Sequence, residues 1–399
     1  MNRAIFMLAL PVFLAAGTSM VATDLYLPAI PFLPEALNGD EVGAQYTLAA
    51  FFATFAIGQL VFGTLADLYD RRVILTWALA AFAASSAACA LAETMNALIA
   101  LRVVQGFAAS AGTALAPAML REAGDDSLVV RLTSVVSSME AVFPALAPVI
   151  GAWLVFGFGW ESTFWLMAVI ALFTMAAFQR FKMSSAPPHD TNRPPAHIRY
   201  WHLLVSRRFM GYQVSHAMAF AGLIIYIMAS PYLLVTYLGH SMTAFVVMQI
   251  TLIVFFVAFA NFAGVLTDRY GIDYFIVIGA VLQMVSAVAF ISVVVVWPEY
   301  LGATSFTLTM IPMAIGLGLR GGPGFAKAMA FAGTHTGSAG GLMMFTAMGM
   351  SAAGTQIVAP SLSEGPLMVA IAVVICCALS LVMLPMAMKP EPEDPAAED

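Results

Sequence analysis

The sequence carries little charge for its length, with 16 Lys and Arg and 22 Asp and Glu among 399 residues. Soluble domains are roughly one-quarter charged, whereas this chain is 10% charged and 61% hydrophobic. A water-facing globular surface is therefore excluded for most of the chain, and its bulk is expected to face lipid. The formal net charge of −6 also excludes a basic patch of the kind that binds nucleic acid.

Cysteine is scarce too, and Cys89, Cys376 and Cys377 lie in apolar segments without metal-ligand or disulfide spacing. The sequence also lacks a P-loop, a nucleophile elbow and the HExxH phrase of zinc proteases. ATP-driven transport and hydrolysis within the membrane are therefore unsupported. We expect a protein that is not an enzyme, has no catalytic residues and needs neither a metal nor another cofactor.

Apolar stretches long enough to cross a bilayer recur along the whole chain. A membrane-spanning helix needs about 20 apolar residues, because no water is present to satisfy a bare backbone. Twelve such stretches are predicted, at 4–33, 43–65, 73–92, 97–119, 131–156, 160–180, 208–237, 242–266, 274–297, 301–327, 336–359 and 365–387. The predicted fold is an all-α membrane protein with twelve transmembrane helices in two six-helix, pseudo-symmetric halves.

Most basic residues lie in alternate connections between these stretches. Positively charged short loops stay in the cytoplasm, and the loops that contain no Lys or Arg are 34–42, 93–96, 157–160, 238–241, 298–300 and 360–364. Fourteen of the 16 basic residues lie in or beside the remaining loops, at the termini and in the middle segment, and the other two are Arg102 and Arg320. Both termini are therefore expected to be cytoplasmic.

The segment 181–207 separates the two halves and contains four prolines and three histidines. We interpret it as a cytoplasmic linker whose histidines are solvated, because their scattered spacing does not suit a metal site. The predicted organisation is an N-terminal bundle at 1–180, this linker, a C-terminal bundle at 208–387 and an acidic cytoplasmic tail at 388–399.

An internal repeat supports the division into halves. The second and eighth predicted helices end in similar phrases, Gly63-Thr64-Leu65-Ala66-Asp67 and Gly264-Val265-Leu266-Thr267-Asp268. Such repeats are typical of secondary transporters, whose substrate site lies near the midplane between them. Glycine in the phrase permits close helix approach, and the aspartate can accept from helix N-terminal amides or pair with arginine.

Four longer phrases carry a family resemblance. They are Gly63-x-Leu65-Ala66-Asp67-x-x-Asp70-Arg71-Arg72, Leu98-x-x-x-Arg102-x-x-Gln105-Gly106-x-Ala108-Ala109, Ala147-Pro148-x-x-Gly151 and Thr23-Asp24-Leu25-Tyr26-Leu27-Pro28-Ala29-Ile30-Pro31. With them the chain resembles the major facilitator superfamily, within it the twelve-spanner drug:proton antiporters and the Bcr/CflA (bicyclomycin and chloramphenicol resistance) branch. Asp70, Ala147 and Ala152 stand where the family usually has Gly, and Leu68 where it usually has Arg.

The resemblance implies roles for particular residues. Arg102 is expected to couple proton and substrate movement, and the fifth-helix antiporter motif falls on Pro144, Pro148 and Gly151. The loop phrases imply a conformational latch at Gly63, Asp67, Arg71, Arg72 and Asp268. Simple anchoring on the cytoplasmic side is the alternative role of the two latch arginines.

Two carboxylates lie within predicted helices, where a charge is costly unless it faces water or a partner. Burial favours the neutral form of a carboxylate, so Asp24 is the first candidate for a proton carrier. The alternative is an Asp solvated at a helix end broken at Pro28 and Pro31. Glu140 is expected to look into a cavity as a second titrating site or an anchor for a cationic substrate group. Pairing with a neighbouring Arg or hydroxyl is its alternative role.

Two arginines are also predicted inside the membrane. Arg102 cannot shed its proton and must find acceptors, either Asp24 or Glu140, or else Gln105 and first-helix carbonyls. Arg320 lies among glycines and a proline that predict a flexible or broken helix. It is expected to line an inner cavity or to snorkel to the cytoplasm, and we treat its resemblance to the Arg102 phrase as a coincidence.

The substrate cavity is predicted from residue type, because Met and aromatic side chains can line an adaptable apolar pocket. Packing or contact with lipid is the alternative role of each such side chain. The residues assigned to this cavity are Tyr26, Glu140, Phe143, Tyr226, Met310 and Arg320.

These observations predict a proton-coupled secondary transporter that exports small amphipathic compounds or drugs by alternating access. The alternatives are a dedicated metabolite or siderophore exporter or importer on the same fold, and a non-transporting membrane sensor or assembly factor. Costly intramembrane charges argue against the sensor. We expect a monomer in the bacterial inner membrane, with protons, a small-molecule substrate and lipid as its partners and no nucleic acid.

Overall fold

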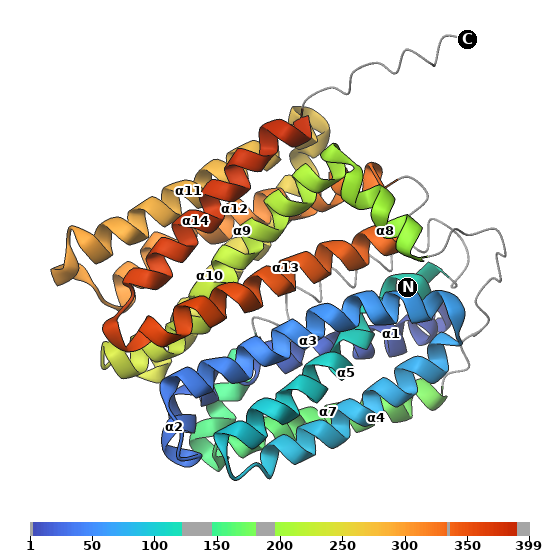
Figure 1. The fold of residues 1–399 in the computed structure, drawn as a ribbon, viewed down its shortest axis with the longest axis horizontal. Coiled ribbons are helices and arrows are strands. Elements are labelled where there is room, and N and C mark those ends of the chain that lie inside the picture. Colours follow the sequence, from blue (N-terminus) through green and yellow to red (C-terminus); the bar gives the residue numbers. More distant parts are fainter. Residues whose placement is uncertain (1–2, 122–145, 181–195, 333–335, 389–399) are drawn as a thin grey trace.

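Long helices make up nearly all of the computed structural model (Figure 1), which describes residues 3–121, 146–180, 196–332 and 336–388. No strand occurs in these ranges. The long helices are α1 (Arg3–Asp24), α3 (Glu41–Leu68), α4 (Arg71–Ala90), α5 (Met95–Arg121), α7 (Glu161–Arg180), α9 (Arg207–Pro231), α10 (Met242–Tyr270), α11 (Ile272–Val295), α12 (Ala303–Ala330), α13 (Thr336–Val358) and α14 (Leu367–Met388). The short elements are η1 (Leu27–Phe32), α2 (Leu33–Ala36), α8 (Ala196–Val205), η2 (Tyr232–Tyr237), η3 (Pro298–Tyr300) and η4 (Ala359–Glu364).

Ten helical segments in the described ranges are long and apolar enough to cross a membrane, in agreement with ten of the twelve predicted spans. The fifth predicted span is described only as the apolar helix Leu146–Phe158. The tenth is α12, which is long enough but is made less apolar by Arg320 and Lys327. The predicted all-α membrane fold is confirmed.

Prolines act differently in two of these helices. The first span was predicted at 4–33, with a break at Pro28 and Pro31 as one alternative. The structure has this break: α1 ends at Asp24 and a 3-10 turn with Pro28 and Pro31 follows, because proline lacks an amide and restricts the residue before it. The predicted break in α12 is wrong. That helix passes through Pro323 without interruption, and it packs against α10 and α11.

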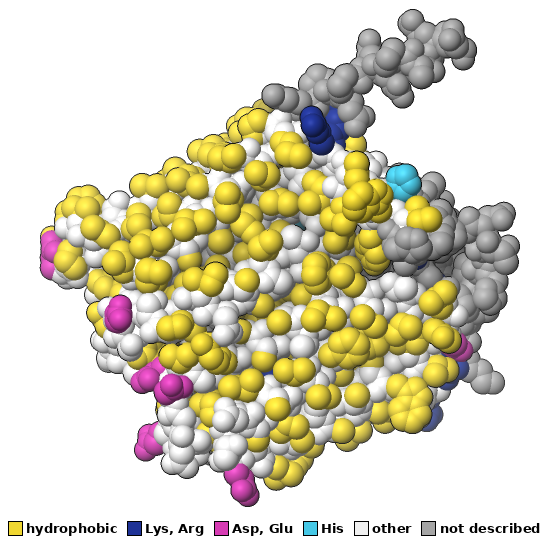
Figure 2. Space-filling model, viewed as in Figure 1, with side chains coloured by type: hydrophobic (Ala, Val, Ile, Leu, Met, Phe, Trp, Pro, Cys, Tyr) yellow, Lys and Arg dark blue, Asp and Glu magenta, His cyan; other side chains and the backbone are white. Residues whose placement is uncertain are grey.

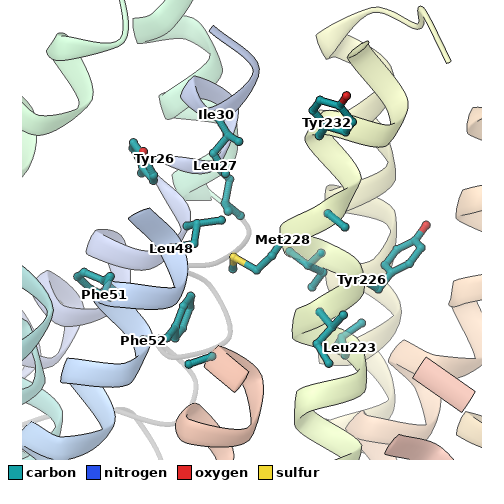
Figure 3. Packing of buried hydrophobic residues seen from close by; sticks show 14 of the residues in the cluster. Tyr26, Leu27, Ile30, Leu48, Phe51, Phe52, Leu223, Tyr226, Met228 and Tyr232 are labelled. Atoms are coloured by element: carbon teal, nitrogen blue, oxygen red, sulfur yellow. The ribbon is translucent and has the colours of Figure 1, made fainter. Parts of the chain in front are cut away.

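The helices form two bundles that lie side by side (Figure 1), and α13 packs against α3 as well as against α9. The bundles also meet near α2, at what we call the α2 end of the molecule, where η1 packs against α9 and η2. Figure 3 shows Leu27 and Leu48 of one bundle facing Met228 of the other. All three are fully buried members of one apolar cluster that spans both bundles, so side chains seal the bundles together at this end.

Within each bundle, helices approach until their backbones touch. A Cβ atom on Gly106 of α5 would meet the backbone carbonyl of Phe51 in α3. Gly279 and Gly316 face one another, since a Cβ on either would lie 2.5 Å from the other's carbonyl oxygen. The expected close approach at Gly63 is wrong, because its missing side chain has no atom within 4 Å.

The predicted linker contains a helix. Within 181–207 the structure describes α8, and a single residue, Ser206, separates it from α9. The hydroxyl of Ser206 caps α9 by accepting from the amide of Phe209 at 3.4 Å. His202 is exposed, as expected for a solvated histidine, whereas His189 and the side chain of His197 fall outside the described part.

Candidate functional site

Asp24 is the last residue of α1, and 9% of its surface is exposed. The hydroxyl of Thr23 donates to its Oδ2 at 3.0 Å. No basic side chain pairs with it among the residues that the structure describes. The structure thus places a carboxylate in an apolar environment, at the point where α1 gives way to the 3-10 turn.

Arg102 is fully buried in α5 and is enclosed by aromatic rings. Its guanidinium carbon lies 4.6 Å from the ring centre of Tyr26, 4.1 Å from that of Phe51 and 5.8 Å from that of Phe164. The negative faces of aromatic rings stabilise a cation, by about 2 kcal/mol or more when water is excluded. Phe51 and Phe164 complete this aromatic box, and no spacing in the sequence had indicated them.

The polar partners of Arg102 are neutral. Its Nη1 donates to Gln105 Oε1 at 2.6 Å, and its Nε donates to the backbone carbonyl of Thr47 at 3.4 Å. Gln105 donates in turn to the hydroxyl of Ser86 at 2.7 Å. The expected link through Gln105 is confirmed, but the carbonyl comes from α3 rather than from the first helix.

Arg102 and Asp24 form no ion pair in this conformation, and Glu140, the other expected partner, lies outside the described residues. The Nη2 atom of Arg102 is buried and has no hydrogen-bond partner among the residues that the structure describes. A buried cation with an open donor favours the approach of any acceptor or negative charge. The arrangement can therefore respond to a charge that appears beside it.

The fifth-helix motif lies against the Asp24 segment. A Cβ atom on Gly151 would meet the carbonyl of Leu25 and the ring of Pro28. Ala147 and Pro148 are buried on the same helix. Pro144 and Phe143 lie outside the described residues. The motif helix therefore contacts the backbone of the residue that follows Asp24.

We expect Gly151→Leu to lower the transport rate at least about tenfold. The leucine side chain would force the helix away from Leu25 by more than about 1 Å, and in enzymes a misplacement of roughly 1 Å can lower the rate about 100-fold. Gly157→Leu is the matched control, since no atom lies within 4 Å of a Cβ at Gly157 on the same helix. Flux into proteoliposomes measures both variants. Equal flux in the two variants would show that the contact at Leu25 has no role.

The described members of the predicted cavity, Tyr26, Tyr226, Met310 and Arg320, are each buried inside a bundle in this conformation. Tyr26 and Tyr226 are fully buried and point into their own bundles, away from the contact between bundles (Figure 3). The Tyr226 hydroxyl donates to the backbone carbonyl of Phe306 at 2.8 Å. Met310 is fully buried as well. Leu27, Leu48 and Met228 face the partner bundle instead.

The C-terminal bundle contains a similar arrangement without a charge. The Tyr226 hydroxyl lies 3.3 Å from Met248 Sδ, and the Ser286 hydroxyl lies 3.8 Å from Met310 Sδ. Met310 is the eighth residue of α12, as Arg102 is the eighth of α5. At this helix position the N-terminal bundle has a buried arginine where the C-terminal bundle has a methionine.

Arg320 lies deeper along its helix and is 2% exposed, so the expected snorkelling is wrong. Its Nη1 donates to Gln283 Oε1 at 3.1 Å and to Ser380 Oγ at 2.6 Å, and its Nη2 donates to Ser215 Oγ at 2.6 Å. These bonds join α12 to α9, α11 and α14. Arg320 thus connects four helices inside one bundle. Its partners could not be predicted from the sequence, because a single hydroxyl in an apolar helix does not indicate a contact.

We expect Arg320→Met to destabilise the protein by about 1–3 kcal/mol, because Gln283 loses its donor and three helices lose their shared partner. The midpoint of thermal unfolding in detergent should fall by several degrees. Arg207→Met, at an exposed position in α9, is the matched control and should leave the midpoint unchanged. An unchanged midpoint for Arg320→Met would contradict the connecting role.

The predicted latch is described in part. Arg71 donates from Nε to the carbonyl of Ala66 at 3.0 Å, and Arg72 donates from Nη2 to the carbonyl of Gln179 at 3.0 Å. Arg72 thus binds the end of α7. The side chains of Asp67 and Asp268 lie outside the described part, so their share in a latch stays a prediction.

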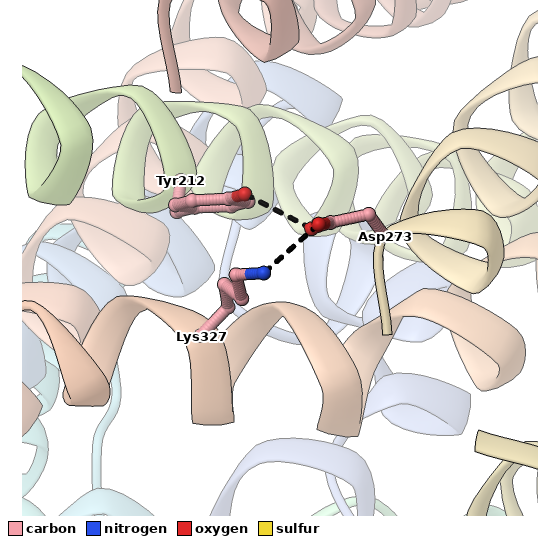
Figure 4. A network of polar contacts seen from close by, with 3 residues as sticks. All are labelled: Tyr212, Asp273 and Lys327. Atoms are coloured by element: carbon pink, nitrogen blue, oxygen red, sulfur yellow. Dashed lines mark hydrogen bonds and ion pairs between the residues drawn. The ribbon is translucent and has the colours of Figure 1, made fainter. Parts of the chain in front are cut away.

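A polar network absent from the sequence predictions lies at the corresponding end of the C-terminal bundle (Figure 4). Lys327 pairs with Asp273 Oδ2 at 2.9 Å, and the Tyr212 hydroxyl donates to Asp273 Oδ1 at 3.1 Å. The three residues come from α12, α11 and α9. They tie these helix ends together as Arg72 ties α4 to α7.

The chain resembles curated multidrug proteins. It is 28% identical over 218 residues to multidrug resistance protein MdtL of Escherichia coli O17:K52:H18, and 29% identical over 218 residues to MdtL of Escherichia coli O45:K1. Each match covers 54% of this chain and 55% of the relative. The chain therefore spans about half the length of the curated relatives it matches.

Comparisons of fold and family cover far more of the chain. The crystal structure of a D-xylose-proton symporter superposes with a TM-score of 0.70 at 16% identity, covering 96% of this chain and 99% of the symporter. That likeness concerns the fold. The family model of the Major Facilitator Superfamily matches residues 12–355. The chain belongs to the Major Facilitator Superfamily.

Proposed function

We propose that the chain is a proton-coupled transporter that exports small amphipathic compounds or drugs in exchange for protons. The observation that carries the proposal is Asp24, a buried carboxylate without a basic partner among the described residues. The free energy needed to ionise a buried carboxylate depends on how well the surrounding protein or water stabilises its charge, and therefore on the conformation. The names of the MdtL relatives supply the class of substrate.

The proposed mechanism uses the seal at the α2 end. A neutral Asp24 is compatible with the closed contact between Leu27, Leu48 and Met228. When Asp24 loses its proton, its carboxylate is stabilised by water or by the open Nη2 of Arg102. A packing of the bundles that brings either of these to Asp24 is then favoured over the closed one. Substrate competes for the same space between the bundles, and the proton gradient supplies the energy without a cofactor.

The charge distribution supports an orientation for this exchange. Figure 2 shows acidic side chains gathered toward the α2 end and basic ones toward the other. Both ends of the described chain lie opposite α2 (Figure 1). Because basic loops stay in the cytoplasm, we propose that the protein lies in the bacterial inner membrane with both termini on the cytoplasmic side and the α2 end on the opposite side. We also propose that the chain acts as a monomer.

The test is transport into proteoliposomes with an acidic lumen and a panel of labelled amphipathic drugs. Uptake that rises with the imposed pH gradient and collapses when a protonophore removes it supports drug:proton exchange. Uptake that is indifferent to the gradient would overturn proton coupling. Gradient-driven uptake of a polar metabolite but of no drug in the panel would favour a dedicated metabolite transporter.

A further inference from the structure

The helix α8 has a one-sided apolar surface that the two bundles leave uncovered. Ile198, Trp201, Leu204 and Val205 are 39%, 65%, 45% and 61% exposed. At 100° per residue they fall within about 120° of one another around the helix. Four large apolar side chains thus form one exposed stripe on a ten-residue helix.

The opposite side of α8 is packed on the protein. Leu203 is 2% exposed and joins a cluster that contains Leu342 and Met343 of α13. Gly341 of α13 lies between α8 and α3. A Cβ atom on this glycine would be 3.8 Å from the Tyr200 hydroxyl of α8 and 3.6 Å from the Gln59 carbonyl oxygen of α3. The helix is therefore held in place, and its stripe faces away from the body of the protein.

The position of α8 identifies the occupant of the stripe. Because only Ser206 separates α8 from the membrane-spanning α9, the stripe lies at the boundary of the bilayer. Tryptophan is enriched at such boundaries. The segment 196–212 contains Arg199, Arg207 and Arg208 but no Asp or Glu. Within it, the side chains of His202 and Arg207 are exposed. The surroundings suit negatively charged lipid head groups.

We propose that α8 is an interfacial helix that inserts this stripe among the lipid tails of the cytoplasmic leaflet and recruits anionic phospholipid through Arg207. Apolar area drives insertion, and the basic residue selects the head group. This inference goes beyond the proposed function, and only its assignment to the cytoplasmic leaflet rests on the orientation proposed there.

Tryptophan fluorescence of the full chain in vesicles tests the insertion. The Trp201 signal is the difference between wild type and Trp201→Phe. Phosphatidylcholine brominated on its acyl chains should quench this difference, and aqueous iodide should not. Trp77, which is 73% exposed on the span α4, provides the positive control through Trp77→Phe. Quenching by iodide alone, or by neither quencher because a second copy covers the stripe, would overturn the proposal.

The choice of lipid is tested with the same signal. Brominated phosphatidylglycerol should quench Trp201 more strongly than brominated phosphatidylcholine at an equal fraction in the vesicle. Arg207→Gln should make the two lipids quench equally, while insertion itself persists. Equal quenching in the wild type would overturn the recruitment of anionic lipid, whatever the outcome of transport measurements.

Discussion

Asp24→Asn is expected to abolish uptake driven by a pH gradient, with a loss of at least about tenfold, which corresponds to about 1.4 kcal/mol. Asparagine matches the shape of the buried carboxylic acid but cannot bind or release a proton near neutral pH. The measurement is initial uptake of a transported drug into proteoliposomes with an acidic lumen. Exchange of drug across the membrane without a gradient should persist, because it needs no change in protonation.

Glu35→Gln is the matched control for this variant. Glu35 is an exposed carboxylate at the same α2 end, so its removal changes the local charge without touching the buried site. It should transport at the wild-type rate. Undiminished gradient-driven uptake in Asp24→Asn would remove Asp24 as the essential carrier and leave Glu140 as the next acid to replace.

The second large effect is expected for Arg102→Lys, although the charge is conserved. The flat guanidinium lies over the rings of Tyr26 and Phe51 and at the same time donates to Gln105 and the Thr47 carbonyl. The compact ammonium of lysine cannot occupy that stack and make both bonds. We expect transport to fall at least about tenfold, since loss of one desolvated cation–π contact costs about 2 kcal/mol.

Arg269→Lys is the control for Arg102→Lys. Arg269 is exposed, and its guanidinium lies 5.5 Å from the ring centre of Tyr270, so water compensates for the change. Transport rate and thermal midpoint of both variants should be measured together. A wild-type rate for Arg102→Lys would show that only the positive charge matters and that the aromatic box has no function.

The sequence was informative at positions where burying a residue costs much free energy. Asp24, Arg102 and Arg320 were each singled out because a charge in an apolar helix is costly, and the structure buries all three. Their partners were harder to predict. The acceptors of Arg320 are hydroxyls and an amide on three other helices, and such neutral groups occur throughout the chain without marking a contact.

Which face of a helix points inward could not be predicted from the apolar pattern. In a membrane both the lipid and the protein interior are apolar, so a buried face and an exposed face have similar composition. Tyr226 was assigned to the cavity for its residue type, yet it points into its own bundle, and Met228 two residues later faces the partner (Figure 3). The helix α8 was missed because basic residues and histidines obscured its apolar stripe.

The glycine contacts described above have a consequence for how this transporter can change over generations. Gly106 in α5, and Gly279 with Gly316 in the other bundle, touch backbone atoms, so almost any mutation there pushes whole helices apart. The seal at the α2 end consists of leucine and methionine side chains, which exchange for other apolar residues at little cost. Under the proposed function, new substrate preferences should therefore arise by single substitutions along the seal, and selection should leave the glycines unchanged.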